Sequence, residues 1–202
     1  HHLLVRRTDT GEVVGSTRIL TQASARLAGS FYSESEFDLS GLLPLPGNAI
    51  EIGRTCIHPD FRNGVTIQTL WMGLAGFMEN HGVDYMFGCA SIGLEEGEPA
   101  VQKILDRIYE KHAAPEKFKV VARERFNPVV SSDLNTLERS KLPALLSAYL
   151  RLGAWVAGDA YLDRDFNCVD VFILLDVSNL SARYRRHFMD GRQPKTRSHD
   201  AA

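Results

Sequence analysis

Apolar residues recur along the chain with two spacings, one typical of strands and one typical of helices. Leu3–Val5 and Val13–Leu20 are rich in β-forming residues and flank the turn sequence Thr8-Asp9-Thr10-Gly11, so they predict a β-hairpin. Later strands are predicted by short apolar runs: Ala49–Ile57, Tyr85–Ile92, Val169–Val177 and, in a short form, Lys119–Ala122. Because Tyr85–Ile92 is almost wholly apolar, we expect its sheet to be covered on both faces.

Apolar residues three and four positions apart predict the helices. Thr66–His81 shows this spacing and is followed by Gly82, a common helix end. Further helices are predicted at Pro99–His112, Leu142–Leu152 and Ser178–Met189, and residues 21–49 predict a long loop with a short helix or turn. Since strands and helices alternate after the hairpin, the predicted fold class is mixed α/β (α+β) around one central sheet. We expect residues 1–190 to form a single domain and residues 191–202 to form a polar, mobile tail.

Composition narrows the class of protein. The 202 residues are 44% hydrophobic and 24% charged, which is enough apolar material for a folded core. The net charge of -2 argues against a nucleic-acid partner, and no apolar run approaches the roughly 20 residues of a membrane helix. The three cysteines are widely spaced and predict reduced core thiols of a cytoplasmic protein, with neither a disulfide framework nor a metal site.

Several catalytic motifs do not occur in the chain. It has no G-x-S-x-G sequence, no P-loop and no G-x-G-x-x-G, so covalent catalysis, ATP and dinucleotide cofactors have no support.

The densest group of polar residues follows the start of the predicted central strand. Alternation along a strand would put Glu51, Gly53 and Thr55 on one face and Arg54 and Cys56 on the other. A Glu near an Arg in an apolar strand predicts either an internal ion pair that braces the sheet or a carboxylate base facing a cleft.

The next segment, Arg62-Asn63-Gly64, precedes a predicted helix. It predicts either a simple turn or a phosphate site built from backbone N–H groups and Arg62.

The segments EIGRTCIHPDFRNG and GCAS, with GEVVGSTRIL, GSFYSESEFDL and DFNCVDVFILLDV, resemble the GNAT acyltransferase superfamily. In detail they are most similar to the ornithine-lipid synthases, bacterial ornithine N-acyltransferases that use acyl-acyl-carrier protein. The related acyl-homoserine-lactone synthases have an Arg on an early strand and a Glu-x-x-Arg on the central strand, which Arg18, Glu51 and Arg54 match. Both families have a portion before the first hairpin strand, so we expect this chain to start within its domain. The resemblance implies a GNAT-like mixed central sheet flanked by helices.

The resemblance also implies transfer of a (3-hydroxy)fatty acyl group from acyl-carrier protein to the α-amine of ornithine, giving lyso-ornithine lipid. The implied catalytic residues are Glu51 and Arg54. The implied substrate-binding residues are Arg18, Arg62, Asn63, Gly64, Cys89 and Ser91. In this scheme Glu51 is the base, Arg18 and Arg54 clamp the acceptor carboxylate, and Arg62 with the Asn63-Gly64 amides holds the phosphate of phosphopantetheine. No metal and no separate cofactor is implied, because the acyl-phosphopantetheine of the carrier protein is the donor.

Other interpretations stay open at this point. The loop after the central strand departs from the Arg/Gln-x-x-Gly-x-Gly/Ala pattern that binds coenzyme A in GNAT enzymes, which favours a carrier-protein donor. The alternatives are a GNAT acetyltransferase that uses acetyl-CoA on another amine and a non-catalytic module that binds acyl-carrier protein or lipid. Trp71, Phe87 and Trp155 are expected to belong to the core or, alternatively, to line an acyl site.

The end of the chain is rich in basic residues: Arg183, Arg185, Arg186, Arg192, Lys195 and Arg197. One interpretation is a docking surface for a negatively charged partner, which would be acidic carrier protein or inner-leaflet lipid. The other interpretation is a solvated charged face. We expect any contact with the inner membrane to be peripheral.

Overall fold

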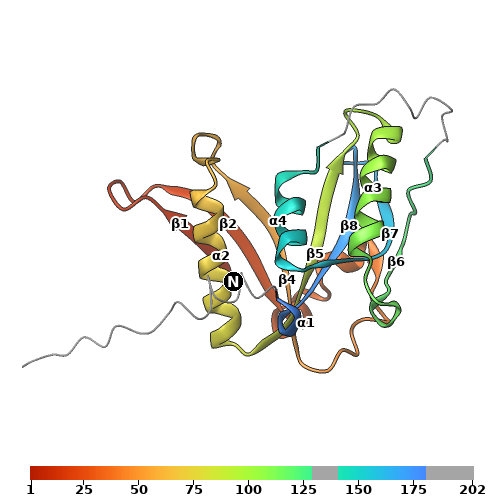
Figure 1. Ribbon diagram of the computed structural model, residues 1–202. Coiled ribbons are helices and arrows are strands. Elements are labelled where there is room, and N and C mark those ends of the chain that lie inside the picture. Colours follow the sequence, from red (N-terminus) through yellow and green to blue (C-terminus); the bar gives the residue numbers. More distant parts are fainter. Residues whose placement is uncertain (129–140, 181–202) are drawn as a thin grey trace, which may run out of the picture.

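A mixed sheet organises the computed structural model, which describes residues 1–128 and 141–180. Within these residues the sheet has six strands in the order β1-β2-β4-β5-β8-β7 (Figure 1). Their bounds are His2–Arg6 (β1), Val13–Thr21 (β2), Asn48–Ile57 (β4), Val83–Gly93 (β5), Trp155–Asp163 (β7) and Cys168–Asp176 (β8). Neighbouring strands are antiparallel except at the centre, where β4 and β5 run parallel.

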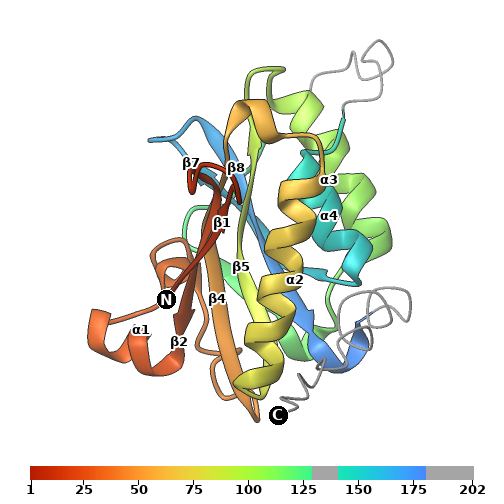
Figure 2. The same cartoon turned by 90° about the vertical axis from the view of Figure 1, so that its left-hand side faces the viewer.

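Three helices cover one face of this sheet (Figure 2). They are α2 (Val65–Asn80), α3 (Glu98–His112) and α4 (Ala144–Leu152). The other face carries shorter elements: α1 (Gln22–Ala28), the 3-10 helices η1 (Tyr32–Ser35) and η3 (Glu116–Phe118), and the small pair of strands β3 (Phe37–Asp38) and β6 (Val121–Ala122). The remaining 3-10 helices are η2 (Pro59–Phe61) and η4 (Val177–Asn179).

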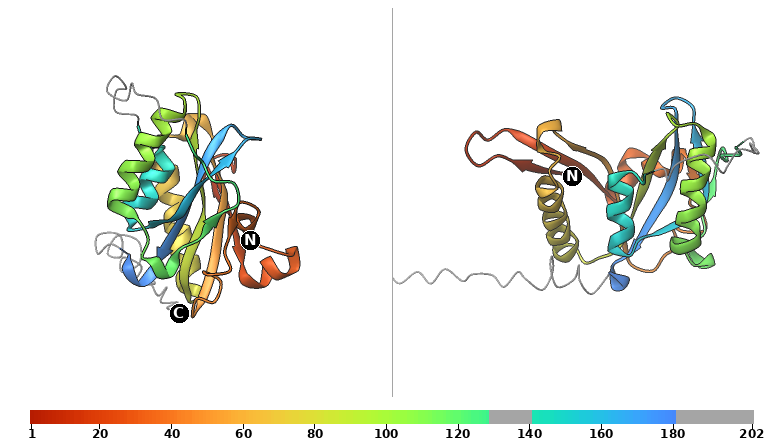
Figure 3. Two further views of the ribbon diagram at one scale, coloured as in Figure 1. Left: turned by 90° about the vertical axis from the view of Figure 1, so that its right-hand side faces the viewer. Right: turned by 45° about the horizontal axis from the view of Figure 1, so that its top comes forward.

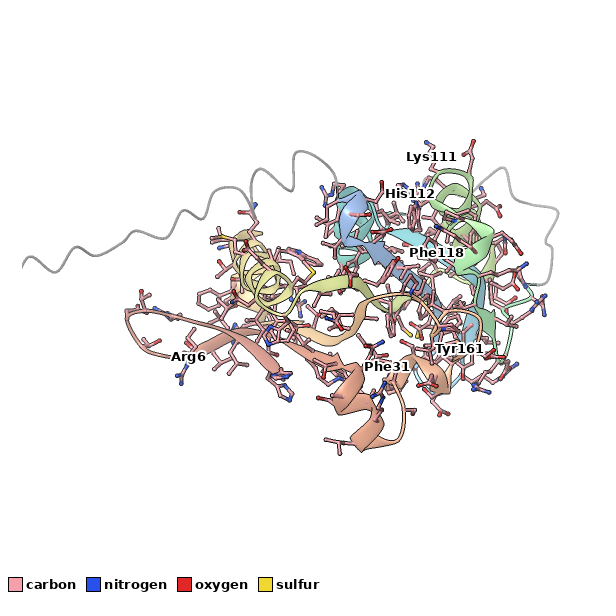
Figure 4. All side chains as sticks on the ribbon, turned by 90° about the horizontal axis from the view of Figure 1, so that it is seen from below. Arg6, Phe31, Lys111, His112, Phe118 and Tyr161 are labelled. Atoms are coloured by element: carbon pink, nitrogen blue, oxygen red, sulfur yellow. The ribbon has the colours of Figure 1, made fainter. Side chains whose placement is uncertain are left out.

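Each face of the sheet has its own hydrophobic core. Along β8, Val169, Val171 and Ile173 pack toward the helices, whereas Phe172 and Leu174 pack toward the opposite side. Phe31, from the segment before η1, and Tyr161 of β7 belong to this second core (Figure 4). Two covered faces explain why β5 and β8 are almost continuously apolar.

The two parallel strands separate halfway along their length. The pairing of β4 with β5 runs from Asn48 opposite Val83 to Glu51 opposite Phe87 and ends there. Beyond this point β4 stays paired with β2, and β5 stays paired with β8, so the two halves of the sheet diverge (Figure 3). Main-chain groups on the facing edges of the two strands are therefore not bonded to each other past Glu51 and Phe87.

A β-bulge in β4 changes the orientation of its polar residues. Arg18 pairs with Gly53 and Ser16 with Cys56, so Arg54 and Thr55 together face Thr17 of β2. Arg54 has a φ of 54°, a backbone conformation that a bulge can require of one residue. The prediction from strict alternation is wrong here: Arg54 shares a cavity with Glu51, and Thr55 faces the helices beside Ile67 and Leu70 of α2.

Most of the predicted elements are confirmed. The hairpin, the later strands, the helices at α2, α3 and α4, and the short helix within residues 21–49 all form. Strand β7 was not predicted, because a shift of register between Ala157 and Tyr161 and a positive φ at Gly158 interrupt its alternation. The predicted last helix lies outside the described residues beyond Leu180, as do the basic residues of the chain end and the predicted tail.

Gly88 occupies the point where β4 and β5 separate. A Cβ atom at this position would collide with the main-chain carbonyl oxygen of Ile52, which cannot move without shifting the strand. We therefore expect Gly88→Ala to lower the free energy of unfolding by about 1–3 kcal/mol, measured by urea denaturation. Gly41→Ala is the matched control, because a Cβ there makes only an ordinary contact with the carbonyl oxygen of Lys119. Equal stability of the two variants would contradict the close packing at Gly88.

Candidate active site

A cavity of about 440 Å³ opens where the central strands separate. Five of the residues predicted from the sequence line it together: Arg18, Glu51, Arg54, Cys89 and Ser91. They come from β2, β4 and β5, which are neighbours in the sheet. The cavity extends to the turn between β7 and β8, where Asp163 and Asp170 also line it.

The carboxylate of Glu51 is buried and saturated with donors. Its Oε1 accepts hydrogen bonds from the main-chain N–H and the hydroxyl of Ser33, both at 2.6 Å. Its Oε2 accepts from the main-chain N–H of Tyr32 at 3.0 Å and from Nη2 of Arg18 at 3.3 Å. Glu51 therefore caps the start of η1 and pairs with Arg18, so the internal ion pair predicted from the sequence is present.

Two guanidinium groups and an aromatic ring form the basic end of the cavity. The Cζ atoms of Arg18 and Arg54 lie 5.7 and 5.2 Å from the centre of the Tyr32 ring. Nε of Arg18 is buried without a hydrogen-bond partner among the described residues, and in the same part of the chain no ion pair involves Arg54. The donors left over at this end suit an incoming carboxylate.

The opposite end of the cavity is acidic. Asp170 of β8 accepts a hydrogen bond from the Ser91 hydroxyl at 2.6 Å and a weaker one from the Cys168 thiol at 3.7 Å. A carboxylate oxygen of Asp163, a carboxylate oxygen of Asp170 and the Sγ atom of Cys168 lie within 4.8 Å of one another. Glu36, which follows η1, lines the same cavity.

Burial raises the pKa of Asp170, and the nearby Asp163 adds to this, against the hydrogen bond from Ser91. Burial likewise raises the pKa of Glu36, where Asp170 and Asp163 again contribute and a contact with Cys89 opposes the change. Both shifts come mainly from burial and from the neighbouring carboxyl groups, and no positive side chain of the described residues is among their causes.

Cys89 is held as a neutral thiol. Burial raises its pKa well above the ordinary value, Glu36 raises it further, and its Sγ donates to the hydroxyl of Ser33 at 3.4 Å. A thiolate is the nucleophilic form of cysteine, so the environment of Cys89 suits contact with substrate rather than covalent catalysis.

The other predicted binding residues lie apart from the cavity. Arg62, Asn63 and Gly64 form the approach to α2, and none of them is among the cavity-lining residues. Gly64 has a φ of 91°, Asn63 accepts from the main-chain N–H of Val65, and Nε of Arg62 donates to the carbonyl of Ile57. The predicted turn is present, and the phosphate site stays a prediction.

The three aromatic residues considered for an acyl site pack in the cores. Trp71 contacts the ring of Tyr149 edge-on at 5.0 Å, Phe87 stacks on Phe172, and Trp155 stacks on Phe118. On the helical side of the divergence, the two cavities that both Ile52 and Tyr149 line measure only about 10 Å³ each. Tyr149 lies buried between them, and burial raises its pKa to about 12.

Comparison of the sequence with known proteins places the chain in a family. Residues 1–72 match the model of an acetyltransferase (GNAT) domain. The chain is 35% identical over 184 residues to the L-ornithine N(alpha)-acyltransferase of Rhodobacter capsulatus, covering 89% of this chain and 70% of that protein. It is 34% identical to the protein of the same name from Rhizobium meliloti, covering 93% of this chain and 67% of the relative.

The chain belongs to the L-ornithine N(alpha)-acyltransferase family.

It is therefore an acyltransferase with a GNAT-like mixed α/β fold, as expected from the sequence. A solved aminoglycoside 6'-N-acetyltransferase complexed with coenzyme A is 12% identical and aligns with a TM-score of 0.46, covering 87% of this chain and 72% of that one. Across the described part of the acyltransferase, no helix combines the length and apolarity needed to cross a membrane.

The cavity of this acyltransferase also has lining residues that were not predicted as site residues from the sequence. They include Tyr32, Glu36, Asp163 and Asp170. Asp170 offered a signal, since it is the lone charged residue inside the apolar run CVDVFILL. Glu36 offered none, because it follows Glu34 in a polar loop whose folding depends on Glu51.

The raised pKa of Asp170 predicts how stability depends on pH. The folded state binds the proton of the Asp170 carboxyl group more tightly than the unfolded chain does. The free energy of unfolding therefore falls as the pH rises through the raised pKa. Above that pH we expect Asp170→Asn to melt at a higher temperature than the wild type, with a difference that shrinks toward pH 4. A change of about 1 kcal/mol corresponds to roughly 2–4 °C in a chain of this length.

Thermal unfolding followed by circular dichroism between pH 4 and 8 measures this difference. Asp165→Asn, an exposed position in the same turn, is the control and should shift the free energy by less than about 0.5 kcal/mol. A lower melting temperature of Asp170→Asn at pH 8 would show that the bonds from Ser91 and Cys168 outweigh the cost of burial.

Proposed function

We propose that this acyltransferase transfers a fatty acyl group from acyl-carrier protein to the α-amine of ornithine and so makes lyso-ornithine lipid. Membership of the L-ornithine N(alpha)-acyltransferase family carries the choice of acceptor. The cavity supports it, because Arg18 and Arg54 present guanidinium groups to an amino-acid carboxylate beside the opening between β4 and β5.

The proposed reaction is a direct transfer between two substrates. The amine nitrogen attacks the thioester carbonyl, a C–N bond forms, and the C–S bond breaks. The amine loses one proton to a base, and the pantetheine sulfur leaves as a thiol after taking up a proton. Main-chain N–H groups on the unpaired edges of β4 or β5 would stabilise the negative charge on the carbonyl oxygen.

Glu51 is the proposed base in this scheme. Its two oxygens already accept four hydrogen bonds, which is about the full capacity of a carboxylate. The bond from Arg18 is the longest of the four, at 3.3 Å. We therefore propose that Arg18 turns from Glu51 toward the acceptor carboxylate on binding, which frees one lone pair for a water or the amine.

The donor side is proposed at the start of α2. Main-chain N–H groups of its first turn, with Arg62 and Gly64, would hold a single phosphate of phosphopantetheine. The departure of this loop from the coenzyme A pattern supports a carrier-protein donor.

A competition assay tests the proposed function. Incubation of the protein with 3-hydroxyacyl-carrier protein, acetyl-CoA and a mixture of amino acids, followed by mass spectrometry, should give N-acyl-ornithine as the main amide. An acetylated product would instead identify a coenzyme A-dependent acetyltransferase. Binding of the carrier protein without any amide product would indicate a non-catalytic module.

Replacement of Glu51 separates its two roles. If Glu51 is the base, Glu51→Gln lowers kcat by roughly 10²–10⁴-fold. Ser33→Ala is the control, because it removes one hydrogen bond to the carboxylate and keeps the carboxylate itself. A rise in KM for ornithine with an unchanged kcat would assign Glu51 to the positioning of Arg18 alone.

A further inference from the structure

The acidic end of the cavity is built from three buried carboxyl groups. Glu36, Asp163 and Asp170 have 4%, 9% and 3% of their surface exposed. They come from separate segments, the loop after η1 and the strands β7 and β8, and all line the cavity that contains Glu51. The ion pairs of the described residues include none of these three groups.

Glu36 is the observation that points to a ligand. Its Oε2 is buried and has no hydrogen-bond partner among the described residues. A buried acceptor of this kind costs free energy unless a donor arrives from outside. Because Asp163 and Asp170 line the same cavity and place further negative charge near Glu36, a donor that carries a positive charge suits this position best.

The cavity is polarised along its length. Arg18 and Arg54 come from β2 and β4 on one side of β5, and Asp170 and Asp163 come from β8 and β7 on its other side, with Glu36 between the two groups beside Tyr32 and Cys89. A ligand that carries an anionic group and a cationic group on a short apolar chain matches this arrangement. Amino acids with an amino group on the side chain have this structure.

We propose that Glu36, Asp163 and Asp170 form the subsite that binds the side-chain ammonium of the acceptor amino acid and select acceptors that carry one. This rests on the proposed function in its assumption that an amino acid is the acceptor. Ser91 acts in the subsite through its hydrogen bond to Asp170, which fixes the direction of that carboxylate.

Ammonium suits this site better than a metal ion does. The Cys168 thiol donates to Asp170, and burial together with Asp170 raises its pKa to about 12, so sulfur is present as a neutral donor. One oxygen of Asp170 also accepts from Ser91, and Oδ1 of Asp163 accepts from the main-chain N–H of Phe166. The oxygens that remain suit one compact cation with several N–H donors.

The test compares ornithine with norvaline, which has the same carbon chain without the amino group. With the acyl donor found in the competition assay, wild-type kcat/KM should be about 100-fold or more higher for ornithine. Asp170→Asn should lower the value for ornithine by roughly 10–100-fold and leave that for norvaline within about 3-fold. Equal use of both acceptors by the wild type, or an equal loss on both in the variant, would overturn the subsite.

Calorimetry without an acyl donor separates this proposal from the proposed function. If the protein acylates neither amino acid but binds ornithine in preference to norvaline, and loses the preference in Asp170→Asn, the subsite stands and the function fails. If it binds neither, or binds both alike, the subsite is wrong. Binding of MgCl₂ or ZnCl₂ that displaces ornithine would instead make the cluster a metal site.

Two further variants guard against an uninformative result. Glu36→Gln should lose the preference for ornithine as Asp170→Asn does, and it leaves the turn between β7 and β8 untouched. Asp165→Asn removes a charge of the same sign from that turn at an exposed position, so its preference should equal that of the wild type. Loss of the preference in Asp165→Asn would show a long-range charge effect and contradict a specific subsite.

Discussion

The buried carboxylate of Glu51 holds the candidate site together. A charge at 1% exposure is tolerable only with close partners, and here two main-chain N–H groups, a hydroxyl and a guanidinium supply them. Three of these donors belong to Tyr32 and Ser33, so Glu51 fixes η1 against the central strand. Through η1 it also sets the position of the Tyr32 ring and of Glu36, which both line the cavity.

The site combines charges of both signs that are kept apart rather than neutralised. Arg18 is the only one of its basic groups with an ion pair in the described part of the chain, and its partner is Glu51. Burial, together with the neighbouring carboxyl groups, raises the pKa of Glu36 and Asp170 and costs stability. The two hydrophobic cores, one on each face of the sheet, provide the stability that offsets this cost.

The sequence was informative where local pattern decides the structure. Apolar spacing located α2, α3 and α4 and nearly all strands, and the resemblance to acyltransferases brought Arg18, Glu51 and Arg54 together correctly. It was uninformative where contacts between distant segments decide. The bulge at Arg54 depends on pairing with β2, strand β7 depends on pairing with β8, and the burial of Glu36 depends on how η1 docks. No spacing along a single strand or loop records these contacts.

Because of the bulge, the number of residues in β4 affects the site independently of which residues they are. Arg54 and Thr55 share one place opposite Thr17, so the strand contains one residue more than its partner over this stretch. Deletion of Thr55 would leave Arg54 alone opposite Thr17 and restore regular alternation. The guanidinium of Arg54 would then lie on the face under α2, where Thr55 lies now, and would leave the cavity. The register of a single strand thus determines whether the acyltransferase keeps its second arginine in the site.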